Sequence, residues 1–209
     1  MLDLRAPTLR PEQGERLVRD VYKRDFRERY EAIHHGDSWK LERLQHFEEQ
    51  GSASRDALSR GDWAEALRLI DERREDLLVS ARDDERRSSV FHRVRVVEKP
   101  LTPYLQWELY SLRQRAEYGE RIRTISAEAV AASESDGPLP EVVILGGHTL
   151  YQVVYNESGA SQGAVRYTDP DIVGIWESYI KELYRAGEDV ESYFAREVAH
   201  LPPPTMNAE

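Results

Sequence analysis

Two similar five-residue segments on either side of a predicted helix constrain the fold more than any other feature. Residues 93–97 read Arg-Val-Arg-Val-Val, and residues 121–125 read Arg-Ile-Arg-Thr-Ile. Arginine alternating with β-branched residues is the period-two pattern of a half-buried strand. Between the segments, Thr102 and Pro103 predict a helix start and Gly119 its end. Because parallel strands need a crossover, the sequence predicts a strand–helix–strand unit with adjacent parallel strands.

The arginines of these two strands are the main candidate site. Side chains alternate across a strand, so we expect all four on one face of the sheet: Arg93, Arg95, Arg121 and Arg123. Four guanidinium groups on one face need anions. One alternative is a ligand or nucleic acid with phosphate or carboxylate groups, which the guanidinium fork fits. The other is an internal ion-pair network with acids such as Glu108 or Glu177.

His148 is the fifth predicted ligand-binding residue. It follows Gly146 and Gly147, so its ring can reach the edge of the arginine face. The alternative is an ordinary turn histidine. His34 and His35 are adjacent and point to different sides of a helix, so no metal site is expected. The sequence has no nucleophile elbow, phosphate loop or dinucleotide fingerprint, so catalytic residues are unknown and no cofactor is expected.

The charge distribution separates the middle of the chain from its end. The net charge of −10 over 209 residues argues against non-specific nucleic-acid binding by the whole chain. Residues 86–123 carry nine basic and four acidic residues, a local charge of +5. Residues 124–209 carry 14 acidic and four basic residues, a local charge of −10. We expect the acidic last third to fold over the basic middle.

Composition also predicts the compartment. The chain has no cysteine, as is usual in a reducing cytoplasm. It has no apolar run near the roughly 20 residues of a membrane span, and no signal-peptide core at its start. A cytoplasmic protein with no membrane partner is expected.

The pattern along the chain predicts three parts: a helical region at 1–85, an α/β domain at 86–200 and a tail at 201–209. Asp37 and Ser38 are taken as the N-cap of a helix that carries Trp39 and Leu41. Further strands are expected at 141–145, 150–155 and 164–167, and a helix after Asp169-Pro170. The fold class is therefore α+β, with an N-terminal helical region packed on a mixed five-stranded sheet flanked by helices.

Two helices are expected to supply much of the core. Their stripes at helical spacing predict six buried residues: Leu105, Leu109, Leu112, Ile172, Trp176 and Ile180. Tyr104, Trp107 and Glu108 lie on the first of these helices, where core packing is the preferred interpretation and a pocket wall the alternative.

The stretches 93–109 and 116–123 resemble an actinobacterial domain of unknown function, found in Streptomyces and its relatives. Its pattern is R-V-R-V-V-x-x-P-L-T-x-Y-x-x-W/F-E-L followed by an A-G-E-x-I-R element, and Tyr118 stands where that element is usually small. The resemblance covers about residues 38–200. Members are often encoded beside helix-turn-helix regulators, which implies a DNA-binding partner. The family brings no established catalytic residues.

The predicted element order also resembles half of a phospholipase D-like fold, and an acetyltransferase-like sheet is a competing analogy. The phospholipase D superfamily carries H-x-K-x4-D on a strand. Aligning its histidine with His148 places Leu150 at the lysine and Tyr155 at the aspartate. Both phosphotransfer partners would be missing, so the analogy concerns the fold only.

Two functional expectations follow. The first is a cytoplasmic, non-catalytic regulatory or interaction protein whose arginine face binds an anion. Its partners would be a DNA-binding regulator or a phosphate-bearing ligand such as tRNA or a nucleotide, and it would form a homodimer. The alternative is a transferase for an anionic substrate, a nucleotide or an aminoacyl-tRNA, in specialised metabolism.

Overall fold

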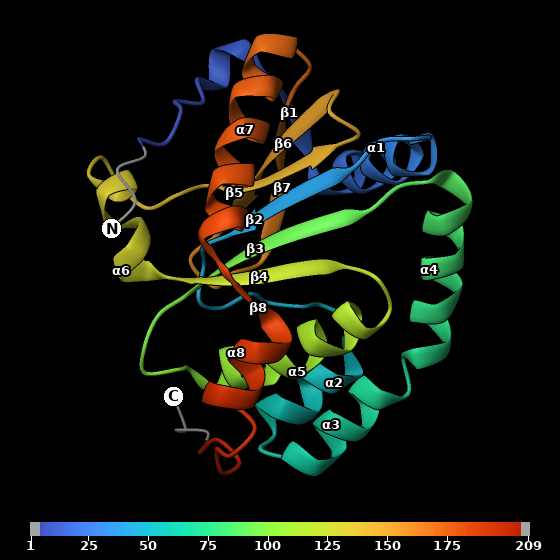
Figure 1. Cartoon of the computed structure of the whole chain (residues 1–209), viewed down its shortest axis with the longest axis vertical. Coiled ribbons are helices and arrows are strands. Elements are labelled where there is room, and N and C mark those ends of the chain that lie inside the picture. Colours follow the sequence, from blue (N-terminus) through green and yellow to red (C-terminus); the bar gives the residue numbers. More distant parts are fainter. Residues whose placement is uncertain (1–4, 206–209) are drawn as a thin grey trace.

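A computed structural model describes residues 5–205, which form one mixed sheet of eight strands with helices on both faces (Figure 1). The strand order is β1-β7-β6-β5-β2-β3-β4-β8. The strands are β1 (Glu15–Val18), β2 (Ser38–Glu42), β3 (Phe91–Val97), β4 (Arg121–Ser126), β5 (Glu141–Leu145), β6 (Thr149–Tyr155), β7 (Ser161–Tyr167) and β8 (Glu188–Asp189).

The helices fill the connections between these strands. They are α1 (Arg19–Glu31), α2 (Ala53–Ser59), α3 (Trp63–Asp71), α4 (Arg74–Arg87), α5 (Pro103–Glu117), α6 (Ala127–Val130), α7 (Pro170–Ala186) and α8 (Val190–Glu197), with 3-10 turns at Pro11–Gln13 and Ala131–Glu134. No helix in residues 5–205 is long and apolar enough to cross a membrane.

Three adjacent strands, β2, β3 and β4, run parallel, and every other pair is antiparallel. The predicted strand–helix–strand unit is confirmed, because α5 connects β3 to its parallel neighbour β4. The α5 helix begins as predicted: the Thr102 side chain accepts a hydrogen bond from the Leu105 amide, with Pro103 in the first turn.

The α+β class is confirmed, but the sheet has eight strands rather than the predicted five. The prediction of a helix capped by Asp37 and Ser38 is wrong, because this segment forms the strand β2. Trp39 and Leu41 are buried in the core beneath α7, while Lys40 between them points to the other face. This alternation is the period of a strand, and pairing with both β3 and β5 fixes it at the centre of the sheet.

The other missed strands lie at the two edges of the sheet. Leu17 and Val18 lie inside the region predicted to be helical, but they belong to β1, and α1 begins at the next residue, Arg19. The two-residue β8 is too short to leave a sequence pattern. A helical region spanning all of residues 1–85 is therefore wrong at β1 and β2, although the helices α1 to α4 lie within it.

The two faces of the sheet have different coverings. Figure 1 shows α7 across one face, and its apolar stripe packs on β2, β3 and neighbouring strands. On the opposite face, α1 packs over β5 to β7, and α5 with α8 packs over β3 and β4. Five of the six predicted core residues are buried; Ile172 is only partly buried. On the same helix, Ile175 is 58% exposed, whereas Val173 is buried.

The tail predicted at 201–209 is described only to residue 205, in an irregular segment after α8. Within it, the Pro202 carbonyl accepts a hydrogen bond from the Gln106 side chain on α5. Residues 206–209 lie outside the described part of the chain.

Candidate ligand-binding cleft

The four arginines of the twin strands lie on two different faces of the sheet, so the expectation of a common face is wrong. The parallel register pairs Arg93 with Ile122 and Val94 with Arg123. Partners in a parallel pair project to the same side, and a register shift of one residue reverses the faces. Ile122 consequently packs in the core beneath α5, while Arg123 lies on the α7 face.

Arg95 is an internal ion-pair residue. It is fully buried, and its Nε donates to Glu108 Oε2 at 2.8 Å. Its Nη1 donates to the Val96 carbonyl at 3.1 Å, and the guanidinium carbon lies 5.6 Å from the centre of the Phe47 ring. Tyr104 and Trp107 pack in the same region, which confirms core packing for the aromatic residues of α5.

Arg123 caps the end of α7. Its Nη1 donates to the Gly187 carbonyl at 3.2 Å and to the Tyr184 carbonyl at 3.4 Å. Its guanidinium also lies 4.9 Å from the Tyr184 ring. A cation at the carboxyl end of a helix stabilises the carbonyls that have no helical partner. Arg121 is exposed at the start of β4.

His148 lies apart from these arginines. It is exposed in the turn between β5 and β6, where its amide donates to the Leu145 carbonyl. The preceding Gly147 approaches Glu177 of α7. Arg95, Arg123 and His148 are therefore not brought together: the first is buried, the second caps α7, and the third lies in a turn.

Arg93, by contrast, lines a cleft. Its Nη1 donates to Glu42 Oε2 at 2.7 Å, and its Nη2 donates to Glu120 Oε2 at 3.1 Å. Lys40 Nζ pairs with the other oxygen of Glu42 at 2.5 Å, and Arg115 Nη1 with the other oxygen of Glu120 at 2.7 Å.

These contacts order five side chains into one row of alternating charge, which we call the cation row: Lys40, Glu42, Arg93, Glu120 and Arg115. Although burial raises the pKa of the Glu42 carboxyl, Arg93 and Lys40 outweigh it and hold that pKa well below its usual value. Burial is likewise outweighed at Glu120, whose pKa is lowered by Arg93 and Arg115. Both acids are carboxylates at neutral pH, and neither comes from the acidic last third of the chain.

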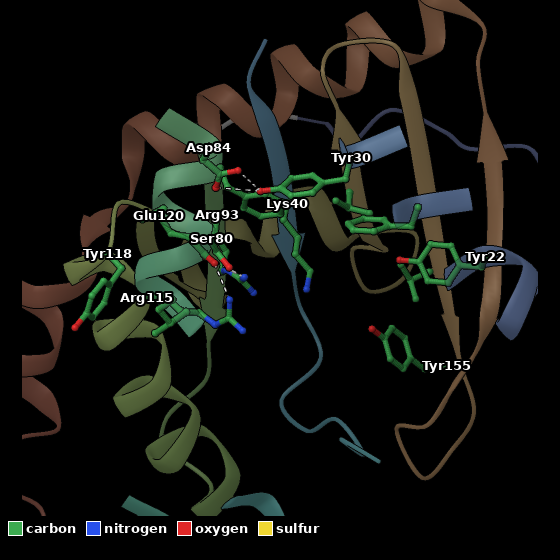
Figure 2. A pocket seen from close by; sticks show the side chains of 16 residues that line it. Tyr22, Tyr30, Lys40, Ser80, Asp84, Arg93, Arg115, Tyr118, Glu120 and Tyr155 are labelled. Carbon is green, nitrogen blue, oxygen red and sulfur yellow. Dashed lines mark hydrogen bonds and ion pairs between the residues drawn. The ribbon is translucent and has the colours of Figure 1, made fainter. Parts of the chain in front are cut away.

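The cleft beside the cation row has a volume of about 340 Å³ (Figure 2). Its floor is the sheet face of β2, β3, β5 and β6, including Val143 and Val153. One wall is α1 and the other is α4, and Arg115, Tyr118 and Glu120 close one end.

Aromatic residues form the α1 side of the cleft. Tyr22, Phe26 and Tyr30 recur every four residues and thus share one face of α1. Their rings follow one another with centres 6.0 Å apart, and Tyr30 meets Phe91 of β3 edge-on at 6.1 Å. Tyr155 of β6 also borders the cleft.

The α4 wall is held by polar contacts. The Tyr30 hydroxyl donates to both oxygens of Asp84, at 2.9 and 3.1 Å. Arg87 pairs with the same Asp84 and donates to the Tyr30 carbonyl at 3.1 Å. None of the residues of α4, all of which are described, is buried. This wall is therefore the less firmly packed side of the cleft.

A comparison with protein families shows which family this chain belongs to. A family model described as a domain of unknown function, DUF6879, matches residues 24–195. The chain belongs to this family. No curated protein matches it. The DUF6879 match contains every residue that lines the cleft except Tyr22.

The DUF6879 domain offers no evident metal centre in its described part: residues 5–205 contain no group of three or more histidine, cysteine, aspartate or glutamate side chains placed to hold a metal ion. His34 and His35 belong to no such group.

Several cleft residues were not among the predicted site residues. Lys40 and Glu42 were missed because a helix was predicted after Asp37 and Ser38, although the alternation from Ser38 to Glu42 is the signal of a strand. The α1 aromatic residues lie in the region predicted to be helical, and no sequence motif marked them as site residues. Arg115 counted only toward the local positive charge, because its pairing with Glu120 depends on the chain reversal at the end of α5.

Proposed function

We propose that this protein is a non-catalytic regulatory protein that binds a small anionic molecule in the cleft beside the cation row. The observation that carries the proposal is the charge of that row. Its three cations, Lys40, Arg93 and Arg115, face two carboxylates, Glu42 and Glu120, which leaves one positive charge. Asp84, the other acid lining the cleft, is paired with Arg87.

Binding is supported over group transfer by the protonation states around the cleft. A general acid or base works best with a pKa near the operating pH. The pKa of Glu120 is lowered, whereas burial raises the pKa values of Tyr22, Tyr30 and Tyr155 further above neutrality. These groups suit fixed charges and hydrogen-bond donors. A transferase for a nucleotide or aminoacyl-tRNA is therefore the less supported alternative.

The regulatory part of the proposal places the protein in the cytoplasm of an actinobacterium, beside a DNA-binding regulator as partner. In this account, the anion stabilises the α4 wall, and the partner responds to that change. Co-purification with a helix-turn-helix regulator encoded beside this chain tests it. We expect the amount recovered to change when a binding anion is added, and an unchanged amount would contradict regulation through this partner.

The binding itself is tested by calorimetry and thermal shift with a panel of small anions: acetate, benzoate, phosphate, phenyl phosphate and benzenesulfonate. The variant Ala81→Trp places an indole in the cleft from α4, and Val79→Trp is its matched control on the exposed side of the same helix. We expect at least one anion to bind the wild type and Val79→Trp but not Ala81→Trp. Failure of the whole panel, or unchanged binding to Ala81→Trp, would contradict the proposal.

A further inference from the structure

The unpaired charge of the cation row lies where a ligand can reach it. The side chains of Lys40 and Arg115 at its two ends are 26% and 27% exposed, whereas Arg93 in the middle is 9% exposed. Lys40 and Arg115 each meet one carboxylate, so N–H donors remain on both. Arg93 is already engaged by two acids. The ends of the row are the available anion-binding donors.

The number of charges limits the ligand. Among the described residues that line the cleft or pair with those lining it, the cation row has an excess of one positive charge, and Asp84 is compensated by Arg87. A monoanion brings the row to neutrality. A phosphate monoester carries a charge of about −1.5 to −2 at neutral pH. It would leave a half-enclosed site with an excess of negative charge beside Glu120, which favours a monoanion such as a carboxylate.

The remaining surface of the cleft is mostly aromatic and aliphatic. The rings of Tyr22, Phe26 and Tyr30 form one wall, while Val143 and Val153 form the floor. Aromatic rings prefer edge-to-face or offset contacts with other rings, and such contacts add to the energy of burial. A volume of about 340 Å³ is at the small end of ligand pockets. The cleft therefore suits a molecule with one or two rings.

Two hydroxyl groups lie across the cleft from the cation row. Figure 2 shows the Tyr22 and Tyr155 side chains on the side opposite Arg93 and Arg115, with their oxygens toward the cleft. Within residues 5–205, neither hydroxyl has a hydrogen-bond partner. Burial raises the pKa of both, so both are neutral donors. They match a second, uncharged polar group on the ligand.

We infer that the ligand of this cleft is a planar aromatic monocarboxylate with an uncharged polar substituent at its far end. The carboxylate binds Lys40 and Arg115, the ring lies against the α1 aromatic residues, and the far substituent meets the hydroxyls of Tyr22 and Tyr155. This inference rests on the proposed function, because it names the ligand class of the same cleft.

The charge part is tested with three probes that share one ring system: 2-naphthoate, its neutral analogue 2-naphthamide and the phosphate monoester 2-naphthyl phosphate. In calorimetry at pH 8, we expect 2-naphthoate to bind at least about tenfold more tightly than either other probe, since the gain comes from charge-assisted hydrogen bonds without excess charge. Equal binding of the amide, or tighter binding of the phosphate, would overturn the monocarboxylate.

The residue assignment is tested with Arg115→Gln and its control Arg113→Gln on the same helix, where Arg113 stacks on Phe194 outside the cleft. Arg115→Gln should weaken 2-naphthoate at least about fivefold and leave 2-naphthamide unchanged. Arg113→Gln should change neither. Equal losses for both probes, or for both variants, would overturn the role of Arg115.

The contact between the ligand's far substituent and the two tyrosine hydroxyls is tested with 6-hydroxy-2-naphthoate. Its hydroxyl should improve binding over 2-naphthoate in the wild type, and Tyr155→Phe should remove that improvement. An improvement that persists in both Tyr155→Phe and Tyr22→Phe would overturn the second polar contact. If neither benzoate nor a naphthyl probe binds while another anion of the panel does, the ligand class is wrong and the proposed function stands. If nothing binds, both fail.

Discussion

Arg95 and Arg93 have different roles because their surroundings differ. In the sequence Arg95 is equivalent to Arg93, two positions away on the same face. Arg93 reaches the cleft, whereas Arg95 is enclosed by Glu108, Phe47 and strand carbonyls. Its Nη2 is buried and has no hydrogen-bond partner in the described residues. Such a residue is held by its ion pair rather than by water.

We predict that Arg95→Ala lowers the free energy of unfolding by about 3–5 kcal/mol, because the buried Glu108 carboxyl loses its cation and keeps the hydrogen bond from the Tyr104 hydroxyl. The double variant Arg95→Met with Glu108→Leu should recover most of this loss, since apolar replacement of a buried pair is often neutral. Urea unfolding followed by circular dichroism measures both. A loss under about 1 kcal/mol for Arg95→Ala would mean that Arg95 is not enclosed as described.

Glu141 gives a pH-dependent prediction. Burial raises the pKa of its carboxyl to about 7, and repulsion from Glu42 acts in the same direction. The hydrogen bonds that Oε1 accepts from the Leu44 and Arg43 amides act in the opposite direction. The unfolded chain releases this proton near pH 4.5 and the folded chain near 7, so between these values the folded state binds more protons. This group therefore makes the protein less stable as pH rises from about 4.5 to 7.

The variant Glu141→Gln removes that dependence while its amide oxygen can still accept from the two backbone amides. The difference in unfolding free energy, variant minus wild type, should rise between pH 4.5 and 7 by up to about 3 kcal/mol and then level off. Urea titrations at a series of pH values measure it. A difference that stays constant with pH would show that Glu141 ionises normally in the folded protein.

At the scale of elements, the register of β3 and β4 decides which arginines can meet. The motif alone suggested in-phase pairing, which would place all four on one face. The observed register is shifted by one residue, because Ile122 completes the core beneath α5 and Arg123 reaches the end of α7. A repeat in sequence thus predicted the strands and their parallel pairing but not their phase, which depends on the elements packed on each face.

Two substitutions on β4 check this register. Ile122→Ala should cost about 2–5 kcal/mol, since its side chain is buried among Leu105, Leu109 and Val190. Arg121→Ala, one residue away, should change stability by less than about 0.5 kcal/mol, because Arg121 is exposed. The opposite order of losses in urea unfolding would refute the assigned faces.

The α4 wall gives a second prediction for an element. Tyr30→Phe removes the hydrogen bonds to Asp84 that tie α4 to α1, at a cost of about 0.5–1.5 kcal/mol. Amide hydrogen exchange should increase mainly in residues 74–87, because α4 buries none of its own side chains there. Tyr110→Phe, a tyrosine packed on Trp63 and Phe194, is the control. Exchange that rises equally across the protein, or in neither variant, would contradict the role of the Tyr30–Asp84 hydrogen bonds in holding α4 against α1.

For the whole molecule, the sequence predicted the class, the central β3–α5–β4 unit and most of the core, because those features depend on local periodicity and caps. It did not predict the cleft. The cleft needs α1 from the start of the chain, β2 from residues 38–42 and Glu120 from a later loop, all brought together on one sheet face. Once β2 was assigned to a helix, Lys40 and Glu42 could not be placed beside Arg93.

The cleft between α1 and α4 is the place where we propose that a small aromatic anion binds, at the cation row. The most direct measurement is a crystal structure of the protein with 6-bromo-2-naphthoate, with the bromine located by its anomalous signal. We predict the bromine near Tyr22 and Tyr155, and the carboxylate within hydrogen-bond distance, about 3 Å, of Lys40 or Arg115. A bromine outside this cleft, or in it with the carboxylate directed away from both cations, would contradict the account.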